Sequence, residues 1–131
     1  MRKKNLLETI ITVRQQKLEK LLRTISLLRA KYREIEKQEQ VIREKIKRIK
    51  NDIHLEMDRY SSRCSFTIAD VNKMENRYQR MMMPLPGLER QKQACTGDRN
   101  AIRRQLEQTK NRFEQAKLKL DNIEKLKNEI L

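Results

Sequence analysis

Apolar residues recur along the first half of the chain at alternating steps of three and four. Between residues 7 and 60, sixteen such positions follow one another without a slip, and thirteen are apolar. They are Leu7, Ile11, Arg14, Leu18, Leu21, Ile25, Leu28, Tyr32, Ile35, Glu39, Ile42, Ile46, Ile49, Ile53, Glu56 and Tyr60. A repeat of about 3.5 residues is typical of a coiled-coil seam. The spacing predicts one helix over about residues 5–60.

The second half carries a weaker version of the same repeat. Its seam positions are Val71, Met74, Tyr78, Met81, Leu85, Leu88, Lys92, Cys95, Arg99, Ile102, Leu106, Thr109, Phe113, Ala116, Leu120, Ile123, Lys127 and Ile130. They predict a second helix over about residues 67–131. Pro84 and Pro86 each disfavour the α conformation in the preceding residue, so we expect a kink or break at 84–87. Gly97 is a softer interruption, and the helix should continue through it.

A short polar segment, residues 61–66, separates the two helices. Thr67 and Asp70 follow it with the spacing of a capping box, and Phe66 and Val71 have that of a hydrophobic staple. The sequence therefore predicts an all-α fold, a long antiparallel two-helix coiled-coil hairpin that forms a single domain over residues 1–131. We expect it to be a monomer when alone.

A turn centred near residue 63 also predicts which residues face each other. The expected pairs are Leu7 with Leu120, Ile11 with Ala116, Ile25 with Ile102, and Ile42 with Leu85. Glu39 should then lie near Lys92, and Cys95 opposite residue 32.

Several seam residues are polar or chemically distinctive. Arg14, Glu39 and Glu56 are either exposed at a loosely packed seam or fix its register, as polar seam residues can do. Met81, Met82 and Met83 are either seam and flank residues or an adaptable apolar surface. We expect no disulfide between Cys64 and Cys95, and we expect His54 to be solvated.

Composition excludes several classes of protein. The chain has 131 residues and a formal charge of +14, with 38% charged residues, 4% aromatics, two Gly and two Pro. So few turn residues exclude a strand-rich fold. No run approaches the roughly 18 apolar residues of a membrane span, and the basic N-terminus is not followed by the apolar stretch of a signal peptide. Two cysteines favour a reducing compartment, so we expect the cytoplasm.

No enzyme site can be assembled from these residues. A two-helix seam leaves no cleft, and His54 is the only histidine, without metal-ligand neighbours at a suitable spacing. We therefore predict no catalytic residue, no metal and no cofactor.

The positive charge is spread along the chain. Residues 1–60 hold 17 basic and 9 acidic side chains, and residues 61–131 hold 15 and 9. This distribution argues against a basic region that precedes a leucine zipper. It remains compatible with nonspecific binding to nucleic acid, with an anionic membrane, or with a position inside a protein ring.

Taken together, these features resemble the central stalk proteins of bacterial type III secretion, the YscO/FliJ-like family. The resemblance is carried by the opening segment Leu6–Arg14, the charged heptads to Tyr60, the short polar turn, and the second helix that begins at Thr67 and includes Tyr78 and the Met run. Pro84 and Pro86 depart from the plain second helix of that family.

The resemblance implies a function and two sets of contact residues. Such proteins insert in the hexameric secretion ATPase, promote its oligomerisation and hydrolysis, and link it to the export gate of the inner-membrane secretion apparatus. Some also bind substrate chaperones or the needle-length regulator. The implied ATPase contacts are Arg2, Lys3, Lys4, Lys117, Lys119, Lys125 and Lys127. The implied export-gate or chaperone contacts are Met74, Tyr78, Met81, Met82 and Met83.

Two other functions stay open at this point. One is a coiled-coil adaptor or scaffold, which could dimerise through parallel helices. The other is a basic coiled coil that binds nucleic acid or anionic lipid without sequence specificity.

Overall fold

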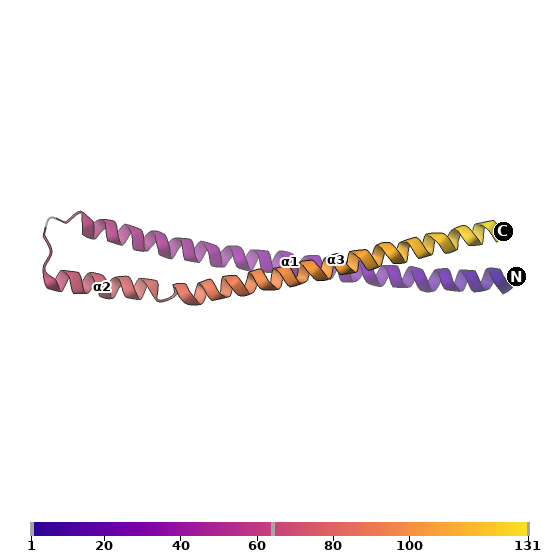
Figure 1. Ribbon diagram of the computed structural model, residues 1–131, viewed down its shortest axis with the longest axis horizontal. Coiled ribbons are helices and arrows are strands. Elements are labelled where there is room, and N and C mark those ends of the chain that lie inside the picture. The colour runs from indigo at the N-terminus through magenta and orange to yellow at the C-terminus, as the bar shows by residue number, and fades with distance from the viewer. Residues whose placement is uncertain (1, 64, 131) are drawn as a thin grey trace. The chain divides into compact units, whose positions relative to one another are not determined.

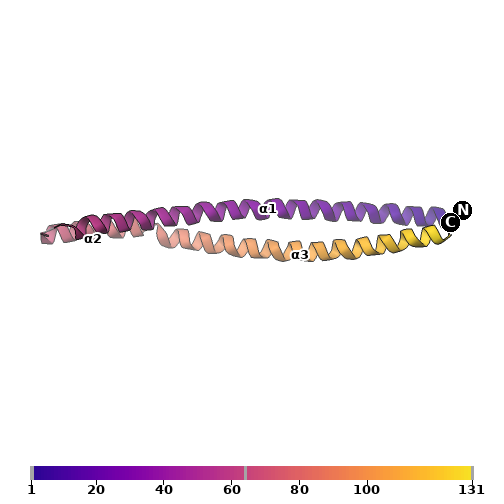
Figure 2. The same ribbon diagram turned by 90° about the horizontal axis from the view of Figure 1, so that it is seen from above.

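The computed structural model describes residues 2–63 and 65–130, and within these ranges the chain is helical without strands (Figures 1 and 2). Its helices are α1 (Arg2–Ser61), α2 (Ile68–Met82) and α3 (Leu85–Ile130). The all-α prediction is confirmed, and so is the division into a first helix and an interrupted second one. Helix α1 begins three residues earlier than expected. The prediction for Cys64 lies outside the described residues.

The contacts divide the chain into two units. Unit 1 consists of Met1–Glu34 and Asn100–Leu131, and unit 2 is Ile35–Arg99. In unit 1 the first part of α1 lies antiparallel to the last part of α3, so that α1 begins where α3 ends (Figures 1 and 2). Unit 2 is a helical hairpin in which the chain turns back after α1 and continues as α2 and the start of α3.

The predicted seam is buried along nearly its whole length. All sixteen predicted positions of α1 are buried or half-buried, and so is every predicted position from Met81 to Lys127. In unit 1 the buried apolar residues are Ile11, Ile25, Leu28, Ala116 and Leu120. Ile10 and Met57 are two half-buried apolar residues outside the predicted set. The 3.5-residue period therefore identified the packed face of each helix.

Unit 2 is built around a small apolar cluster. Ile46 and Ile53 of α1 pack with Leu85 of α3, and five partly buried residues cover them. These are Ile42, Ile49, Met57, Met81 and Leu88. Because only one stripe of each helix is covered, no large side chain among the described residues is completely buried.

The interruption of the second helix is confirmed, although it comes slightly earlier than expected. Helix α2 ends at Met82, and Met83 and Pro84 form the break before α3 begins at Leu85. The Met83 amide still donates to the Gln79 carbonyl at 3.0 Å, and the Leu88 amide donates to the Pro84 carbonyl at 3.2 Å. Pro86 costs no hydrogen bond, since amides in the first turn of a helix have no partner within it. The heptad phase consequently survives, and Gly97 is helical as predicted.

Helix α2 starts with the predicted capping box. The Asp70 amide donates to the Thr67 hydroxyl and the Thr67 amide donates to the Asp70 carboxylate, both at 3.1 Å. The two exposed residues of the expected staple, Phe66 and Val71, flank this cap. No residue of α2 is buried. In Figure 1, α2 begins beyond the end of α1, so the start of α2 has no opposing helix.

This placement of α2 makes the predicted register wrong by about one heptad. Glu39 contacts Arg99 instead of Lys92, Tyr32 contacts Arg103 instead of Cys95, and Glu8 contacts Lys127. Arg103 and Lys127 each lie eight residues further along the chain than a turn centred near residue 63 would require, and Arg99 lies seven residues beyond Lys92. The expected pairs Leu7–Leu120, Ile11–Ala116 and Ile25–Ile102 are shifted accordingly, whereas Ile42 still packs on the cluster that contains Leu85. A shift of seven keeps every seam residue on the seam, so the hydrophobic pattern alone could not reveal it.

We expect Ile46→Asp to lower the free energy of unfolding by roughly 3–4 kcal/mol, because it removes a buried side chain and buries a carboxylate without a partner. Val41→Asp is the matched control, since Val41 lies on the same helix and is exposed. Helicity and thermal melting check both. Equal effects of the two substitutions would contradict the seam assignment.

The Asp70 cap predicts a pH effect. A hydrogen bond with the Thr67 backbone amide is the main cause that holds the pKa of Asp70 below its ordinary 3.8. A hydrogen bond with the Thr67 side chain adds to this effect. The ionised carboxylate therefore supports the start of α2 above that ordinary value, and its contribution is lost as the pH falls through the lowered pKa. An NMR titration should give an Asp70 midpoint below 3.8, and Thr67→Ala should raise it. A midpoint at or above 3.8 would show that the cap does not form.

Candidate functional site

Pairing the two ends of the chain concentrates its charge. Unit 1 contains 18 Lys or Arg and 8 Asp or Glu, a net charge of +10, whereas unit 2 contains 14 and 10, a net charge of +4. This asymmetry is hidden in the linear sequence, where the two halves carry similar charges, because the two basic segments lie at opposite ends of the chain. Unit 1 is therefore the more cationic surface.

A groove of about 460 Å³ runs between the two helices of unit 1. Its lining residues are Lys17, Lys20, Leu21 and Thr24 of α1 and Arg112, Gln115, Ala116 and Lys119 of α3. We call this the basic groove, since four of the eight residues are cations and none is acidic. Among the described residues, these four cations form no ion pair.

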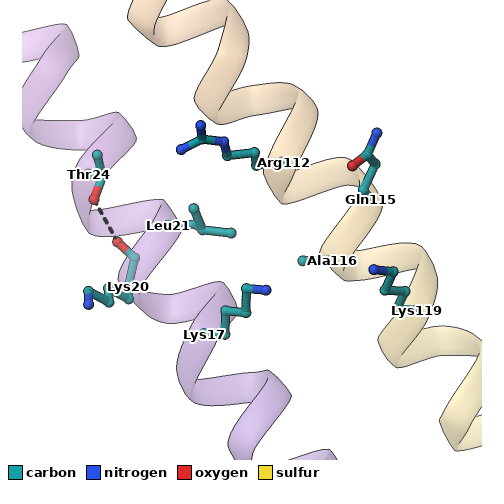
Figure 3. A pocket seen from close by; sticks show the side chains of 8 residues that line it. All are labelled: Lys17, Lys20, Leu21, Thr24, Arg112, Gln115, Ala116 and Lys119. Carbon is teal, nitrogen blue, oxygen red and sulfur yellow. Dashed lines mark hydrogen bonds between the residues drawn. The ribbon is translucent and has the colours of Figure 1, made fainter.

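The shape of the basic groove follows from the seam. Ala116 occupies a seam position with a shorter side chain than its seam neighbours Phe113 and Leu120, so the helices leave a hollow beside Leu21 (Figure 3). Lys17, Arg112 and Lys119 reach toward this space, while Lys20 points away from α3 at its outer edge (Figure 3). The groove thus has an apolar floor and a cationic rim.

The basic residues singled out from the sequence all belong to unit 1, but they are not equivalent. Arg2, Lys3, Lys4, Lys117 and Lys125 are exposed, and Lys119 lines the basic groove. Lys127 differs, because it is half-buried and its Nζ lies 3.6 Å from a Glu8 carboxylate oxygen. Lys127 is therefore less available to a partner than the other six residues, since it is engaged across the seam.

The predicted export-gate or chaperone contacts also include both half-buried and exposed residues. Met74 and Met81 are half-buried, and Met81 packs on the apolar cluster of unit 2. Tyr78, Met82 and Met83 are exposed, with 80% of Met83 accessible. The exposed apolar surface of this region also includes Phe66 and Ile68, which were not singled out as contact residues.

Two carboxylates are buried on the α1 side of unit 2. Glu39 is 2% exposed and Glu56 is 8% exposed. Each pairs with one arginine of its own helix and one arginine across the seam. Glu39 accepts a hydrogen bond from Arg43, and its Oε2 lies 3.3 Å from Arg99 Nη1. For Glu56, Oε2 lies 3.8 Å from Arg59 Nη1 and Oε1 lies 3.1 Å from Arg77 Nη1.

These contacts decide between the two interpretations of the polar seam residues. Glu39 and Glu56 are not exposed at a loose seam, and both form ion pairs between the helices. Lys92, the expected partner of Glu39, instead lies 3.7 Å from Glu89 on its own helix. Arginine suits the buried site better, because its guanidinium is less strongly hydrated than an ammonium. Arg14 is half-buried, and its Nε has no hydrogen-bond partner in the described structure.

Two further distinctive side chains, His54 and Cys95, belong to unit 2. His54 is exposed as predicted and lies 3.7 Å from Asp58, while Cys95 is half-buried with a free thiol. Within residues 2–63 and 65–130, no cluster of three His, Cys, Asp or Glu side chains could hold a metal ion. None of the helices described is both long and apolar enough to cross a membrane.

Sequence reasoning missed three of the four groove cations. Lys17, Lys20 and Arg112 lie outside the seam, and only the correct register brings them beside Lys119. The available signal was the small seam residue Ala116. A small seam side chain predicts a local hollow, and cations that flank this position in the sequence would line it.

Comparison with known proteins gives no relatives: no family model, no curated protein and no solved structure matches the chain. The candidate function therefore depends on the chemistry of the site itself.

The Glu39 contacts predict a specific energetic coupling. Glu39→Gln should cost about 1–2 kcal/mol, because it leaves Arg99 and Arg43 without a buried counter-charge, although their partial exposure softens the loss. In a double-mutant cycle measured by urea unfolding, Glu39→Gln should couple to Arg99→Ala and not to Lys92→Ala. Coupling of Glu39→Gln to Lys92→Ala alone would contradict this alignment and support one with Lys92 opposite Glu39.

Proposed function

We propose that this protein is the central stalk of a bacterial type III secretion ATPase complex. In this role it would insert in the hexameric ATPase ring, promote its oligomerisation and hydrolysis, and link it to the export gate at the cytoplasmic side of the inner membrane. The observation that carries the proposal is the net charge of +10 on unit 1, the helix pair formed by both ends of the chain.

A protein that engages a ring has to exchange contacts with one subunit after another. Exposed ion pairs are each worth only about 0–1 kcal/mol, so a surface rich in lysine makes many weak contacts without one slow release step. The exposed residues Lys3, Lys4 and Lys125 supply such contacts in unit 1. We assign this unit to the ATPase.

We assign α2 to the export gate, with chaperones or the needle-length regulator as further partners. Its exposed side chains include Tyr78 and Met82, and Met83 follows at the break. Methionine is flexible and polarisable, which suits a surface that meets more than one partner. The incomplete coverage of α2 by α1 supports this assignment, since it leaves apolar surface available.

A nonspecific binder of nucleic acid or anionic membrane is the second candidate, favoured by the same charge. It differs in its salt dependence, because phosphate contacts release counterions and make affinity fall steeply with salt. Strong, salt-steep binding to an arbitrary duplex or to acidic vesicles, without an effect on the ATPase, would favour it. An adaptor built from parallel helices would instead double the mass in solution.

The stalk proposal predicts that the protein raises the hydrolysis rate of its cognate secretion ATPase at physiological salt and shifts the enzyme toward the hexamer. The combined variant Lys3→Glu, Lys4→Glu and Lys125→Glu should lose most of this stimulation, whereas single Lys→Ala changes should do little. Rate and complex size are measured together.

The control is a triple reversal of equal charge in unit 2, Lys37→Glu, Lys45→Glu and Lys47→Glu, all of which are exposed. It should retain stimulation, and circular dichroism should show unchanged helicity for both variants. Normal stimulation by the unit 1 variant, or an equal loss in both, would count against the assignment of unit 1 to the ring.

A further inference from the structure

Two stripes of residues border the basic groove, one on each helix of unit 1, and both repeat at steps of three and four. On α1 the stripe is Leu6, Ile10, Val13, Lys17, Lys20, Thr24 and Leu27, and on α3 it is Gln108, Arg112, Gln115, Lys119, Asn122 and Leu126. Residues at this spacing share one side of a helix. Because residues of both stripes line the same groove, the two stripes lie side by side and form one flank beside the seam.

The flank is chemically divided along its length. Its middle contains the four cations of the basic groove. Toward the chain ends it is apolar, since Leu6 and Val13 of α1 are 62% and 58% exposed and Leu126 of α3 is 47% exposed. A surface that combines exposed leucines with unpaired cations is unlike the mixed-charge exterior expected of a solvated helix.

We propose that this flank is a docking site for an acidic amphipathic helix of a partner protein. The groove spans eight residues on each helix, 17–24 and 112–119, which is about two turns and long enough to contact a short third helix. Glutamate or aspartate side chains of the partner pair with Lys17, Arg112 and Lys119. Its apolar residues cover Leu21 and Ala116 on the floor and the exposed leucines toward the chain ends.

The apolar part of the flank distinguishes this partner from other polyanions. A nucleic acid would neutralise the cations but would leave Leu6, Val13 and Leu126 in water, and no aromatic side chain lines the groove for base stacking. A membrane surface is flat, whereas the basic groove is a hollow between two helices. An acidic helix satisfies the charge and the apolar surface together.

The test uses the full-length protein and a fluorescent synthetic peptide about three heptads long, with Leu at the a and d positions and mainly Glu elsewhere. Fluorescence anisotropy at physiological salt measures its affinity. A peptide of the same composition in scrambled order is the control for charge alone. We expect the amphipathic peptide to bind at least about tenfold more tightly than the scrambled one.

Two protein variants separate the contributions of charge and apolar contact. Lys17→Gln with Lys119→Gln should weaken binding of the amphipathic peptide about tenfold, whereas Lys45→Gln with Lys47→Gln, an equal loss of charge on exposed residues of unit 2, should leave it unchanged. Val13→Asn should weaken binding of the amphipathic peptide and should not change binding of a DNA duplex. All five positions are exposed or lie at the groove rim, so circular dichroism should be unaltered.

Three outcomes would overturn the proposal: equal affinity for the amphipathic and scrambled peptides, equal effects of the two lysine pairs, or tighter binding of a duplex or of acidic vesicles that depends on Lys17 and Lys119. The assay contains no ATPase, and the proposed stalk function is not needed for the site. Loss of ATPase stimulation and loss of peptide binding can therefore be observed independently.

Discussion

The two buried carboxylates of α1 are the constraint on which the pairing of helices in unit 2 depends. Glu39 and Glu56 occupy seam positions and bracket the isoleucines between them. An ionised group at such a site is costly unless it is paired, and only one alignment brings Arg99 and Arg77 opposite them. Apolar seam positions tolerate a shift of the helix register by seven residues, because such a shift exchanges leucine and isoleucine at modest cost. A buried carboxylate does not tolerate such a shift.

This difference explains what the sequence could predict. The seam is a property of one helix at a time, so periodicity identified it in α1 at every position and in α3 up to Lys127. The cap at Thr67 and the break near Pro84 are equally local, and both were predicted. Register is a relation between two helices, and it depends on how far the chain travels before α2 begins. Because α2 starts beyond the end of α1, the estimate from the turn alone failed by one heptad (Figure 1).

The candidate site was harder to predict for the same reason. The cations near either end of the sequence were recognised one by one, yet the groove requires Lys17 to face Lys119 and Ala116 to leave a hollow. The ion pair of Lys127 could not be predicted, because its partner Glu8 is distant in the sequence. The charge of unit 1 was likewise invisible when the chain was divided at its turn. Each of these properties arises only when residues distant in sequence are paired.

The two units therefore differ in how far their cations are balanced by acidic residues. In unit 2 four arginines are drawn into ion pairs with the two buried carboxylates, and this pairing fixes the alignment of the helices. In unit 1 the cations outnumber the acids by ten, and their mutual repulsion opposes the packing of Ile11, Ile25 and Leu120. An anionic partner that binds only the folded pair relieves this repulsion and stabilises unit 1 by mass action. The excess charge that weakens unit 1 alone would thus be a source of affinity for the proposed partner, and the same side chains would link the stability of unit 1 to that binding.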